Sequence, residues 1–228
     1  MSRPFYYSTH YVIFYNMEII WIGYSCLRLK GKNNTVVTDP IPPGLGYTLD
    51  TAAADIITVS HQHPNHSFTG SITGSPRVIN RPGEYEIRGV LIIGIPTYHD
   101  AENGAKLGKN TVFVTEVDDI SVCHLGDLGH PLSAKQIEEI GNVDVLLVPV
   151  GGGDTISASQ AAALCRAMEP KIVIPMHYKT PTLNKELDTV EKFLKEMGVA
   201  EAVPQPKLVL SKSTLPLTTQ VMLLNPSI

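Results

Sequence analysis

The sequence has few cysteines, and none is arranged to form a disulfide framework or a zinc-binding pair. Cys26, Cys123 and Cys165 are the only three in 228 residues, and no C-x-x-C pattern occurs. An odd number of widely spaced cysteines indicates reduced, buried thiols in a cytosolic protein. Cys123 lies close in sequence to the candidate metal ligands below, but we do not expect it to be a ligand.

The chain also lacks long apolar runs. No stretch approaches the roughly 18 apolar residues that suggest a membrane span. The first residues, MSRPFYYSTHYVIFYN, lack the apolar segment and cleavage site of a signal peptide. We therefore expect a cytoplasmic protein without a membrane partner. Because Met17 opens a strand-like run, residues 1–16 are interpreted as an N-terminal extension and residues 17–228 as a single domain; an edge strand at 10–15 is the alternative.

Charged residues are sparse, and neither sign forms a block. They make up 18% of the chain, hydrophobic residues make up 43%, and the formal net charge is −4. This balance is typical of a globular chain and argues against a nucleic-acid partner, although it leaves a local basic patch open. The segment PVGGG (149–153) is not a P-loop, so a flexible connection and a backbone site for substrate or an anion are its two interpretations.

Short strand-like runs dominate the first half of the chain. The runs 18–23, 25–31 and 34–39 are separated by glycine or asparagine turns, which predicts an antiparallel meander. Further strands are expected at 55–60, 76–80, 89–99, 110–117 and 119–127, and Asp118–Asp119 is expected to form a hairpin turn.

Helical patterns appear in the second half. Helices are expected at 133–141, 157–170 and 183–198, alternating with strands at 143–150, 171–177, 207–211 and 219–224. Ser133 is suited to cap the first of these helices. A meander followed by alternating helices and strands favours sheets covered by helices.

Histidine is concentrated in one short segment. SHQHPNHS (60–67) holds three of the eight histidines in the chain, His61, His63 and His66. Chance would produce this spacing in about 1% of chains of this composition. His99 follows the apolar residues 89–98, Asp127 follows 119–124 and His177 follows 171–174. Strand ends are where α/β folds place ligands and catalytic groups. If these loops meet at one edge, they gather five imidazoles and a carboxylate.

These motifs resemble those of the metallo-β-lactamase superfamily, in the same order. They are Asp39 in VVTDP, the histidines of HQHPNH, His99 in PTYHD, Asp127 in HLGDLGH and His177 in PMHY. Within the superfamily, RPGEYEI, HLGDLGH, PVGGG and IPMHY are most similar to small bacterial Zn-dependent hydrolases related to the ascorbate-6-phosphate lactonase branch. The resemblance covers nearly the whole domain from Met17 onwards.

The resemblance implies an α/β fold, a four-layer αββα sandwich, and a hydrolytic metal site. His61, His63 and His99 would hold one ion, His66 and His177 a second, and Asp127 would bridge them. The imidazole count favours Zn²⁺, with Mn²⁺ and Fe left open. A metal-bound hydroxide would attack a small ester, lactone or phosphodiester. The alternatives are a nuclease or phosphodiesterase acting on nucleic acid and a non-catalytic metal-binding protein. Homo-oligomerisation also stays open.

Asn65 departs from the family pattern, which has an aspartate at this position. The resemblance gives that aspartate a role in binding the second ion and handling a proton, so Asn65 and Asp127 are our candidate catalytic residues. An amide offers a neutral carbonyl oxygen. We expect weaker binding of the second ion; the alternative is that Asn65 still binds a metal or water. A proton could then be handled by Asp100, His124 or His130.

Two further residues are weaker candidates. Asp39 is expected to orient a metal-binding histidine, with a plain turn before Pro40 as the alternative. Glu84 in RPGEYEI is expected in a plain turn, with a role facing the site as the alternative.

Overall fold

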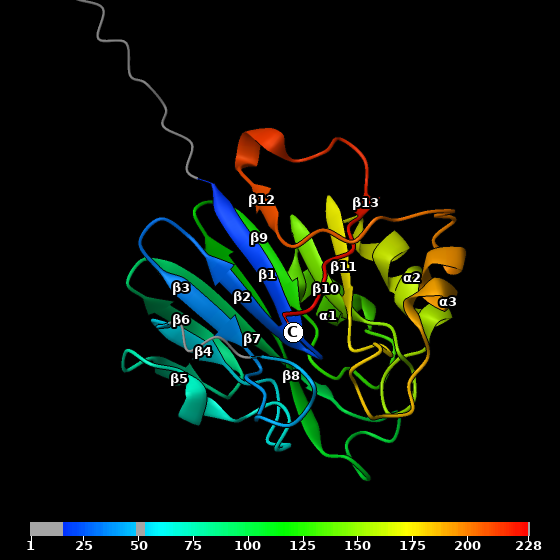
Figure 1. The fold of residues 1–228 in the computed structure, drawn as a ribbon, viewed down its shortest axis with the longest axis horizontal. Coiled ribbons are helices and arrows are strands. Elements are labelled where there is room, and N and C mark those ends of the chain that lie inside the picture. The colour runs from blue at the N-terminus through cyan, green and yellow to red at the C-terminus, as the bar shows by residue number, and fades with distance from the viewer. Residues whose placement is uncertain (1–15, 49–52, 228) are drawn as a thin grey trace, which may run out of the picture.

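The protein folds as two sheets packed face to face (Figure 1). The computed structural model describes residues 16–48 and 53–227. The six-stranded sheet has the order β12 (Leu208–Leu210), β1 (Met17–Gly23), β2 (Cys26–Lys30), β3 (Thr35–Thr38), β4 (Ile56–Thr58), β5 (Arg77–Ile79). The seven-stranded sheet has the order β13 (Gln220–Val221), β11 (Ile172–Met176), β10 (Val145–Pro149), β9 (Ile120–His124), β8 (Lys109–Val117), β7 (Val90–Tyr98), β6 (Gly83–Ile87).

Strand direction brings the chemically active loops to one edge. The β1–β2–β3 meander is antiparallel, as predicted, and β8 and β9 form the expected hairpin. Asp118 and Asp119 make its turn with φ of 49° and 65°, which aspartate tolerates better than most residues. By contrast, β3, β4 and β5 run parallel, as do β9, β10 and β11. Their carboxyl ends therefore lie at the same edge of each sheet.

The inner faces of the sheets form the main core. Trp21, Leu27 and Ile56 from one sheet belong to the same buried cluster as Phe113 and Val122 from the other. The second sheet is covered by short helices: α1 (Ala134–Ile140) contacts β7, α2 (Ala158–Met168) contacts β10, and α3 (Val190–Glu196) packs on α2 (Figure 1). Capping boxes begin α1 and α2, the first at the expected Ser133.

A smaller core lies on the outer face of the six-stranded sheet. Ile22 and Val37 alternate with the residues of the main core and pack instead with Ile41, Tyr47 and Leu183 from loops. In the described parts of 39–55 and 59–76, the only helical segment is the 3-10 turn Thr69–Ser71. The α/β sandwich is thus confirmed, with loops in place of a full helical layer on this side.

Three sequence-based expectations differ from the structure: two elements are shorter than expected, and one segment has a different secondary structure. The helix expected at 183–198 covers only Val190–Glu196, and the strand expected at 219–224 covers only Gln220–Val221. The ammonium group of Lys179 donates to the carbonyl oxygens of Leu183 and Lys185. These bonds hold residues 183–189, which precede α3, as a loop. The expected turn at RPGEYEI is instead the edge strand β6.

The N-terminal extension falls almost wholly outside the described residues, as does the alternative strand at 10–15. Strand β1 does begin at Met17, where the domain was expected to start. Within residues 16–48 and 53–227, the helices are too short to cross a bilayer.

Candidate metal centre

The predicted histidines and Asp127 meet at the carboxyl ends of the strands. His61, His63 and His66 follow β4, His99 follows β7, Asp127 follows β9, and His177 follows β11. One oxygen, Oδ2 of Asp127, is the centre of the cluster. It lies 3.1 Å from Nε2 of His66, 3.2 Å from Nε2 of His177, 3.4 Å from Nε2 of His99 and 4.0 Å from Nε2 of His61. The structure therefore brings together all six residues proposed as ligands.

The cluster contains three compact groups of candidate ligand atoms, and one of them, Asp39, His61 and His66, combines members of the other two. The side-chain nitrogens of His61, His63 and His99 lie within 4.8 Å of one another. The same limit holds for the ligand atoms of His66, Asp127 and His177. These are the two sets that the sequence motifs imply.

Unpaired polar atoms in the cluster fit a metal ion. Nε2 of His61 and Nδ1 of His177 are buried and have no hydrogen-bond partner among the described residues. His177 is fully buried, so its unpaired nitrogen is shielded from bulk solvent. A buried, unsatisfied polar atom costs about 1–3 kcal/mol. Neutral imidazoles around an anionic carboxylate are a ligand set that suits Zn²⁺, so the residues present fit the ion.

Hydrogen bonds fix how three of the histidines face the cluster. Nδ1 of His66 donates to Asp39 Oδ2 at 3.1 Å. Nδ1 of His61 lies 2.9 Å from the hydroxyl of Ser60, which itself donates to Asp39 at 2.5 Å. Nδ1 of His99 lies 3.3 Å from the carbonyl oxygen of Asp154. With Nδ1 occupied, each ring presents Nε2 to the centre. Asp39 thus takes the orienting position expected for it.

Asp127 is held in place as an anion. Ser25 Oγ donates to Asp127 Oδ1 at 3.1 Å, and Asp127 N–H donates to Asn110 Oδ1 at 3.1 Å. Burial alone would raise the pKa of Asp127, but the imidazoles of His177 and His66 outweigh it and hold the pKa well below its usual value. The carboxylate is therefore charged throughout the physiological range.

The backbone around the cluster is unusually constrained. Tyr24, Asp39 and His177 have φ of 56°, 38° and 53°, a region that residues other than glycine seldom occupy. Such conformations cost about 1–3 kcal/mol each and persist where the surrounding structure enforces them. Here a hydrogen bond of 3.0 Å from His177 N–H to the Tyr24 carbonyl oxygen joins two of the three.

Two glycines permit the ligand loops to approach one another. A Cβ atom on Gly129 would lie 2.3 Å from the backbone of His99, and one on Gly151 would lie 2.2 Å from the carbonyl oxygen of His177. Glycine at 151 therefore allows the PVGGG segment to pack against a ligand strand. The segment therefore has a structural role, in addition to its two sequence-based interpretations as a flexible connection and as a backbone site for substrate or an anion.

Asn65 lies at the rim of the cluster and is half-buried. Its side chain faces the hydroxyl of Tyr24 closely enough to lower the pKa of that group. Burial and the Asp127 carboxylate raise the pKa of Tyr24 far above its usual value, and Asn65 opposes this only in part. The Tyr24 ring lies 4.1 Å from the His177 ring and 5.0 Å from the His66 ring, between centroids. Asn65 is thus coupled to the second ligand set through Tyr24.

The alternative proton-handling groups are engaged in structural roles. The Asp100 carboxylate accepts four backbone N–H groups, at Glu102, Gly104, Lys106 and Leu107, and these bonds lower its pKa. His124 is buried with Nε2 2.9 Å from the Ser25 carbonyl oxygen, and His130 Nε2 accepts the N–H of Tyr98. None of the three joins a ligand set within the described residues.

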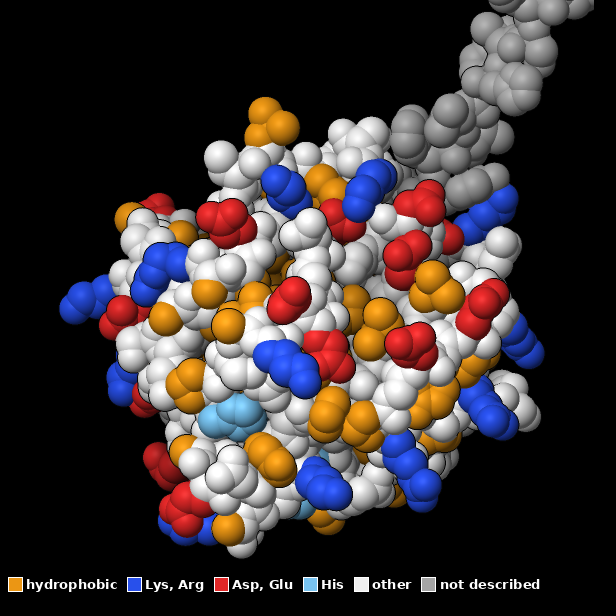
Figure 2. Space-filling view, turned by 180° about the vertical axis from the view of Figure 1, so that it is seen from behind, with side chains coloured by type: hydrophobic (Ala, Val, Ile, Leu, Met, Phe, Trp, Pro, Cys, Tyr) orange, Lys and Arg blue, Asp and Glu red, His pale blue; other side chains and the backbone are white. Residues whose placement is uncertain are grey.

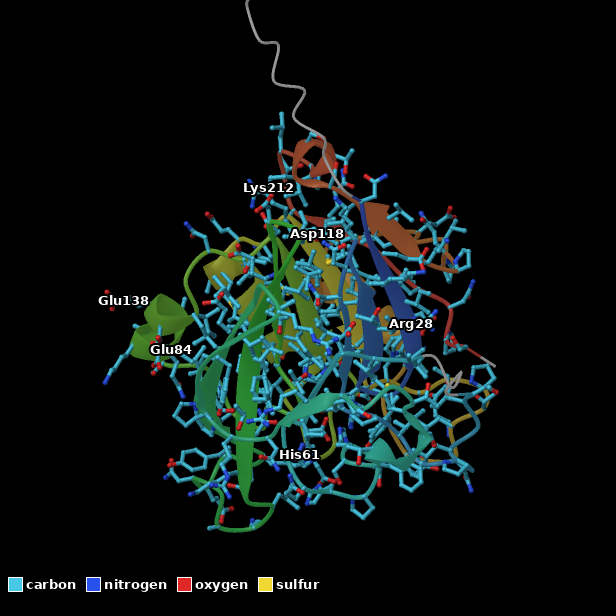
Figure 3. All side chains as sticks on the ribbon, turned by 90° about the vertical axis from the view of Figure 1, so that its left-hand side faces the viewer. Arg28, His61, Glu84, Asp118, Glu138 and Lys212 are labelled. Atoms are coloured by element: carbon cyan, nitrogen blue, oxygen red, sulfur yellow. The ribbon has the colours of Figure 1, made fainter. Side chains whose placement is uncertain are left out.

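Two other candidates are placed away from the metal ligands. Glu84 lies on exposed edge strand β6, apart from His61 in the view of Figure 3, and joins no ligand set among the described residues. Cys123 is buried and, like Cys26 and Cys165, is a free thiol. It joins no ligand set in the described part of the chain, as expected.

A cleft of about 840 Å³ opens beside His61 and His63. Arg81 and Lys109 contribute the charged side chains of its lining, and no aspartate or glutamate lies among the described residues that form it. The volume falls within the range typical of small-molecule sites.

Sequence reasoning missed several residues that support the cluster. Ser60 could have been noticed, because it directly precedes His61 at the end of a strand. Ser25, in the turn between β1 and β2, and Asn110, on β8, reach Asp127 across 102 and 17 residues of chain, and no local pattern marks them. Tyr24 and Lys185 are connected only in the folded chain, by a hydrogen bond that spans 161 residues.

Comparison with known proteins places the chain in a family. A family model described as a beta-lactamase superfamily domain matches residues 18–177. A UPF0173 protein of Pyrococcus abyssi is 30% identical over 187 residues, covering 72% of this chain and 84% of its own. A UPF0173 metal-dependent hydrolase of Methanopyrus kandleri is 26% identical, covering 80% and 94%. A candidate Zn-dependent hydrolase of the metallo-β-lactamase superfamily from Thermotoga maritima has a crystal structure that is similar with a TM-score of 0.77 and 42% identity, over 91% of this chain and 98% of that one.

Proposed function

This chain is a metal-dependent hydrolase that belongs to the beta-lactamase superfamily, and we propose that it hydrolyses a small ester, lactone or phosphodiester at the histidine cluster. One observation carries the proposal: four imidazole Nε2 atoms surround a single carboxylate oxygen of Asp127, at distances of 3.1–4.0 Å. Neutral imidazoles gathered around one buried carboxylate are a donor set that suits a metal ion.

We assign the ligands to two ions. His61, His63 and His99 would hold the first, His66 and His177 would hold the second, and Asp127 would serve as the shared carboxylate; Zn²⁺ suits the nitrogen-rich donors. When bound, such an ion lowers the pKa of its water towards 7 and stabilises the oxygen that develops charge. Asp39 and Ser60 keep His66 and His61 in the tautomers that this requires.

Asn65 makes the two sites unequal. Its amide adds no negative charge to the second ligand set, which then depends on Asp127 alone for an anion. In addition, its position facing the Tyr24 hydroxyl competes with any contact to an ion. We therefore propose a tightly held first ion and a weaker second one. Asp127 stays ionised, so it positions ligands and substrate but does not store a proton.

The cleft supports a small substrate. It reaches the first ligand set at His61 and His63, and its volume of about 840 Å³ suits a molecule of metabolite size. A nuclease would need an extended basic surface. On the face shown in Figure 2, lysine and arginine side chains alternate with acidic ones and form no continuous band. The net charge of −4 favours the same conclusion.

Metal analysis and a substrate panel test the proposal together. Protein purified without added metal, and again after reconstitution with zinc, should contain between one and two ions per chain. Hydrolysis of 4-nitrophenyl acetate, a δ-lactone and bis(4-nitrophenyl) phosphate should then be lost in Asp127→Asn. The matched control is Asp118→Asn, which lies in a hairpin turn at the opposite end of the sandwich (Figure 3).

Three outcomes are informative. Well under one ion per chain after reconstitution would refute the metal-dependent reading. Activity that persists in Asp127→Asn would place the chemistry elsewhere. Full zinc binding without hydrolysis of any substrate class would favour the non-catalytic metal-binding alternative.

A further inference from the structure

We propose that Lys185, Tyr24 and Asn65 form a subsite beside the histidine cluster that binds an anionic oxygen group of the substrate, a carboxylate or a phosphate. The inference rests on the proposed function, because the subsite would hold a substrate whose reacting bond lies at the metal ligands. It adds a substrate class, anionic small molecules, that the metal ligands alone do not specify.

Lys185 brings a positive charge close to the second ligand set. Its half-buried side chain places Nζ 2.7 Å from the hydroxyl of Tyr24 and 5.4 Å from the centre of the Tyr24 ring. That ring is 1% exposed and packs on His66 and His177.

The loop that carries Lys185 is firmly held. Lys179 Nζ donates to the carbonyl oxygens of Leu183 at 2.7 Å and Lys185 at 3.0 Å. Asp188 N–H donates to the carbonyl oxygen of Gly151 at 2.8 Å, which ties the loop to the segment beside His177. Leu183 is buried in the smaller core. Because these contacts order the loop in advance, the binding free energy of an anion would not include the entropy cost of ordering this loop.

The ammonium group retains unused binding capacity. Its bond to Tyr24 is its one polar contact among the described residues, although an ammonium group can donate three hydrogen bonds. Tyr24 accepts from it without neutralising its charge. A half-buried lysine that has no carboxylate partner in the described part of the chain, next to a candidate catalytic site, is suited to bind an anion.

Asn65 explains why the lysine keeps its charge available. Its side chain faces the same Tyr24 hydroxyl that Lys185 contacts. An aspartate at this position would place a carboxylate next to the ammonium group and form an ion pair. The amide keeps the polar contact and removes the competing anion. The residue that departs from the family pattern is therefore the one that leaves Lys185 free for substrate.

The adjoining cleft favours the same substrate class. Its charged lining residues are Arg81 and Lys109, and the described residues that form it include no acidic side chain. The cleft beside His61 and His63 is thus positive although the whole chain carries a net charge of −4. Such local potentials raise the concentration of anionic ligands at a site.

Anion binding to the zinc-loaded protein tests the subsite. The probes are inorganic phosphate and acetate, titrated calorimetrically into wild type, Lys185→Met and Lys185→Arg, with zinc content measured in each preparation. In Lys185→Met, loss of a charged hydrogen bond should weaken the binding of at least one probe by about tenfold or more. Lys185→Arg should recover part of the lost affinity. The probe that shows the larger loss identifies the anion. Lys195→Met, an exposed lysine in α3, should bind like wild type.

The controls separate this inference from the proposed function. If zinc is retained but neither probe binds wild type, or Lys185→Met binds both probes as wild type does, the subsite is overturned and the metal site survives. If zinc is absent from wild type itself, the proposed function fails first. A further comparison uses 4-nitrophenyl acetate and 4-nitrophenyl hemisuccinate: Lys185→Met should raise KM for the anionic ester only, and an equal effect on both esters would also overturn the subsite.

Discussion

The carboxylate of Asp39 joins two metal-facing histidines through one oxygen atom. Asp39 Oδ2 accepts from His66 Nδ1 at 3.1 Å and from the Ser60 hydroxyl at 2.5 Å, and that hydroxyl contacts His61 Nδ1 at 2.9 Å. Because His66 and His61 belong to different ligand sets, Asp39 orients a member of each. Its pKa is lowered even though burial alone would raise it, since the bond from His66 and the nearby imidazoles favour the charged form.

Replacing Asp39 with asparagine should therefore impair both ligand sets. The amide cannot accept from His66 and Ser60 as a charged carboxylate does, so both rings lose orientation. Loss of such an outer partner typically costs about 10–100-fold in metal affinity. Zinc affinity, measured by competition with a chromophoric chelator, should fall in this range. Ser60→Ala should produce a smaller loss because it breaks only the connection to His61. Equal zinc affinity in wild type and Asp39→Asn would contradict the orienting role.

Changing Asn65 to aspartate should have opposite effects on the metal and on anions. A carboxylate adds negative charge near His66 and His177, so the second zinc ion should bind at least about tenfold more tightly. The same carboxylate would pair with Lys185, so phosphate should bind more weakly than to wild type when both are saturated with zinc. Chelator competition and phosphate titration measure the two effects separately. An unchanged second zinc affinity would rule out our explanation of the asparagine.

A methyl group at Gly129 should disturb His99 without touching any ligand atom. The added Cβ would lie 2.3 Å from the His99 backbone, which cannot move aside as a flexible side chain could. Overpacking of this kind typically costs about 1–3 kcal/mol of folding free energy. Gly129→Ala should therefore lower both the unfolding free energy in urea and the zinc affinity. Gly70→Ala is the control, because its Cβ would make only ordinary contact with Phe68 at 3.5 Å. Similar behaviour of the two variants would show that His99 tolerates displacement.

The ligands were predictable because they follow strands that the sequence marks clearly. The run DIITVS ends directly before His61, and KIVIPM ends directly before His177, so each position relative to a strand end could be predicted from local hydrophobicity. Parallel pairing of these strands then places their carboxyl ends at the same edge of each sheet, so the ligands lie close together. Strand β6 was missed for the opposite reason: GEYEI lies at a sheet edge, has no fully buried residue, and follows a Pro-Gly pair that is typical of turns.

The second half of the site depends on contacts that local patterns do not encode. Residues 183–189 have helical periodicity, yet Lys179 occupies two of their carbonyl groups and makes them a loop. That loop presents Lys185 to Tyr24, a residue at the opposite end of the domain in sequence. Ser25 likewise reaches Asp127 only after the two sheets pack together. Tertiary structure thus overrides a local propensity at the very segment that carries the proposed substrate contact.

The buried thiol of Cys165 should make stability fall at alkaline pH. Burial in α2 raises the pKa of Cys165 from 9.0 to about 12. Above pH 9 the unfolded chain releases this proton and the folded chain does not, so the unfolding free energy decreases as pH rises. The decrease from this group should reach about 2 kcal/mol at pH 10.5. In Cys165→Ala it should be absent, whereas the buried thiols of Cys26 and Cys123 contribute equally to both proteins. Urea unfolding of wild type and Cys165→Ala at pH 8 and 10.5 measures how far the unfolding free energy of each protein falls. An equal fall in the two proteins would show that the thiol ionises in the folded protein.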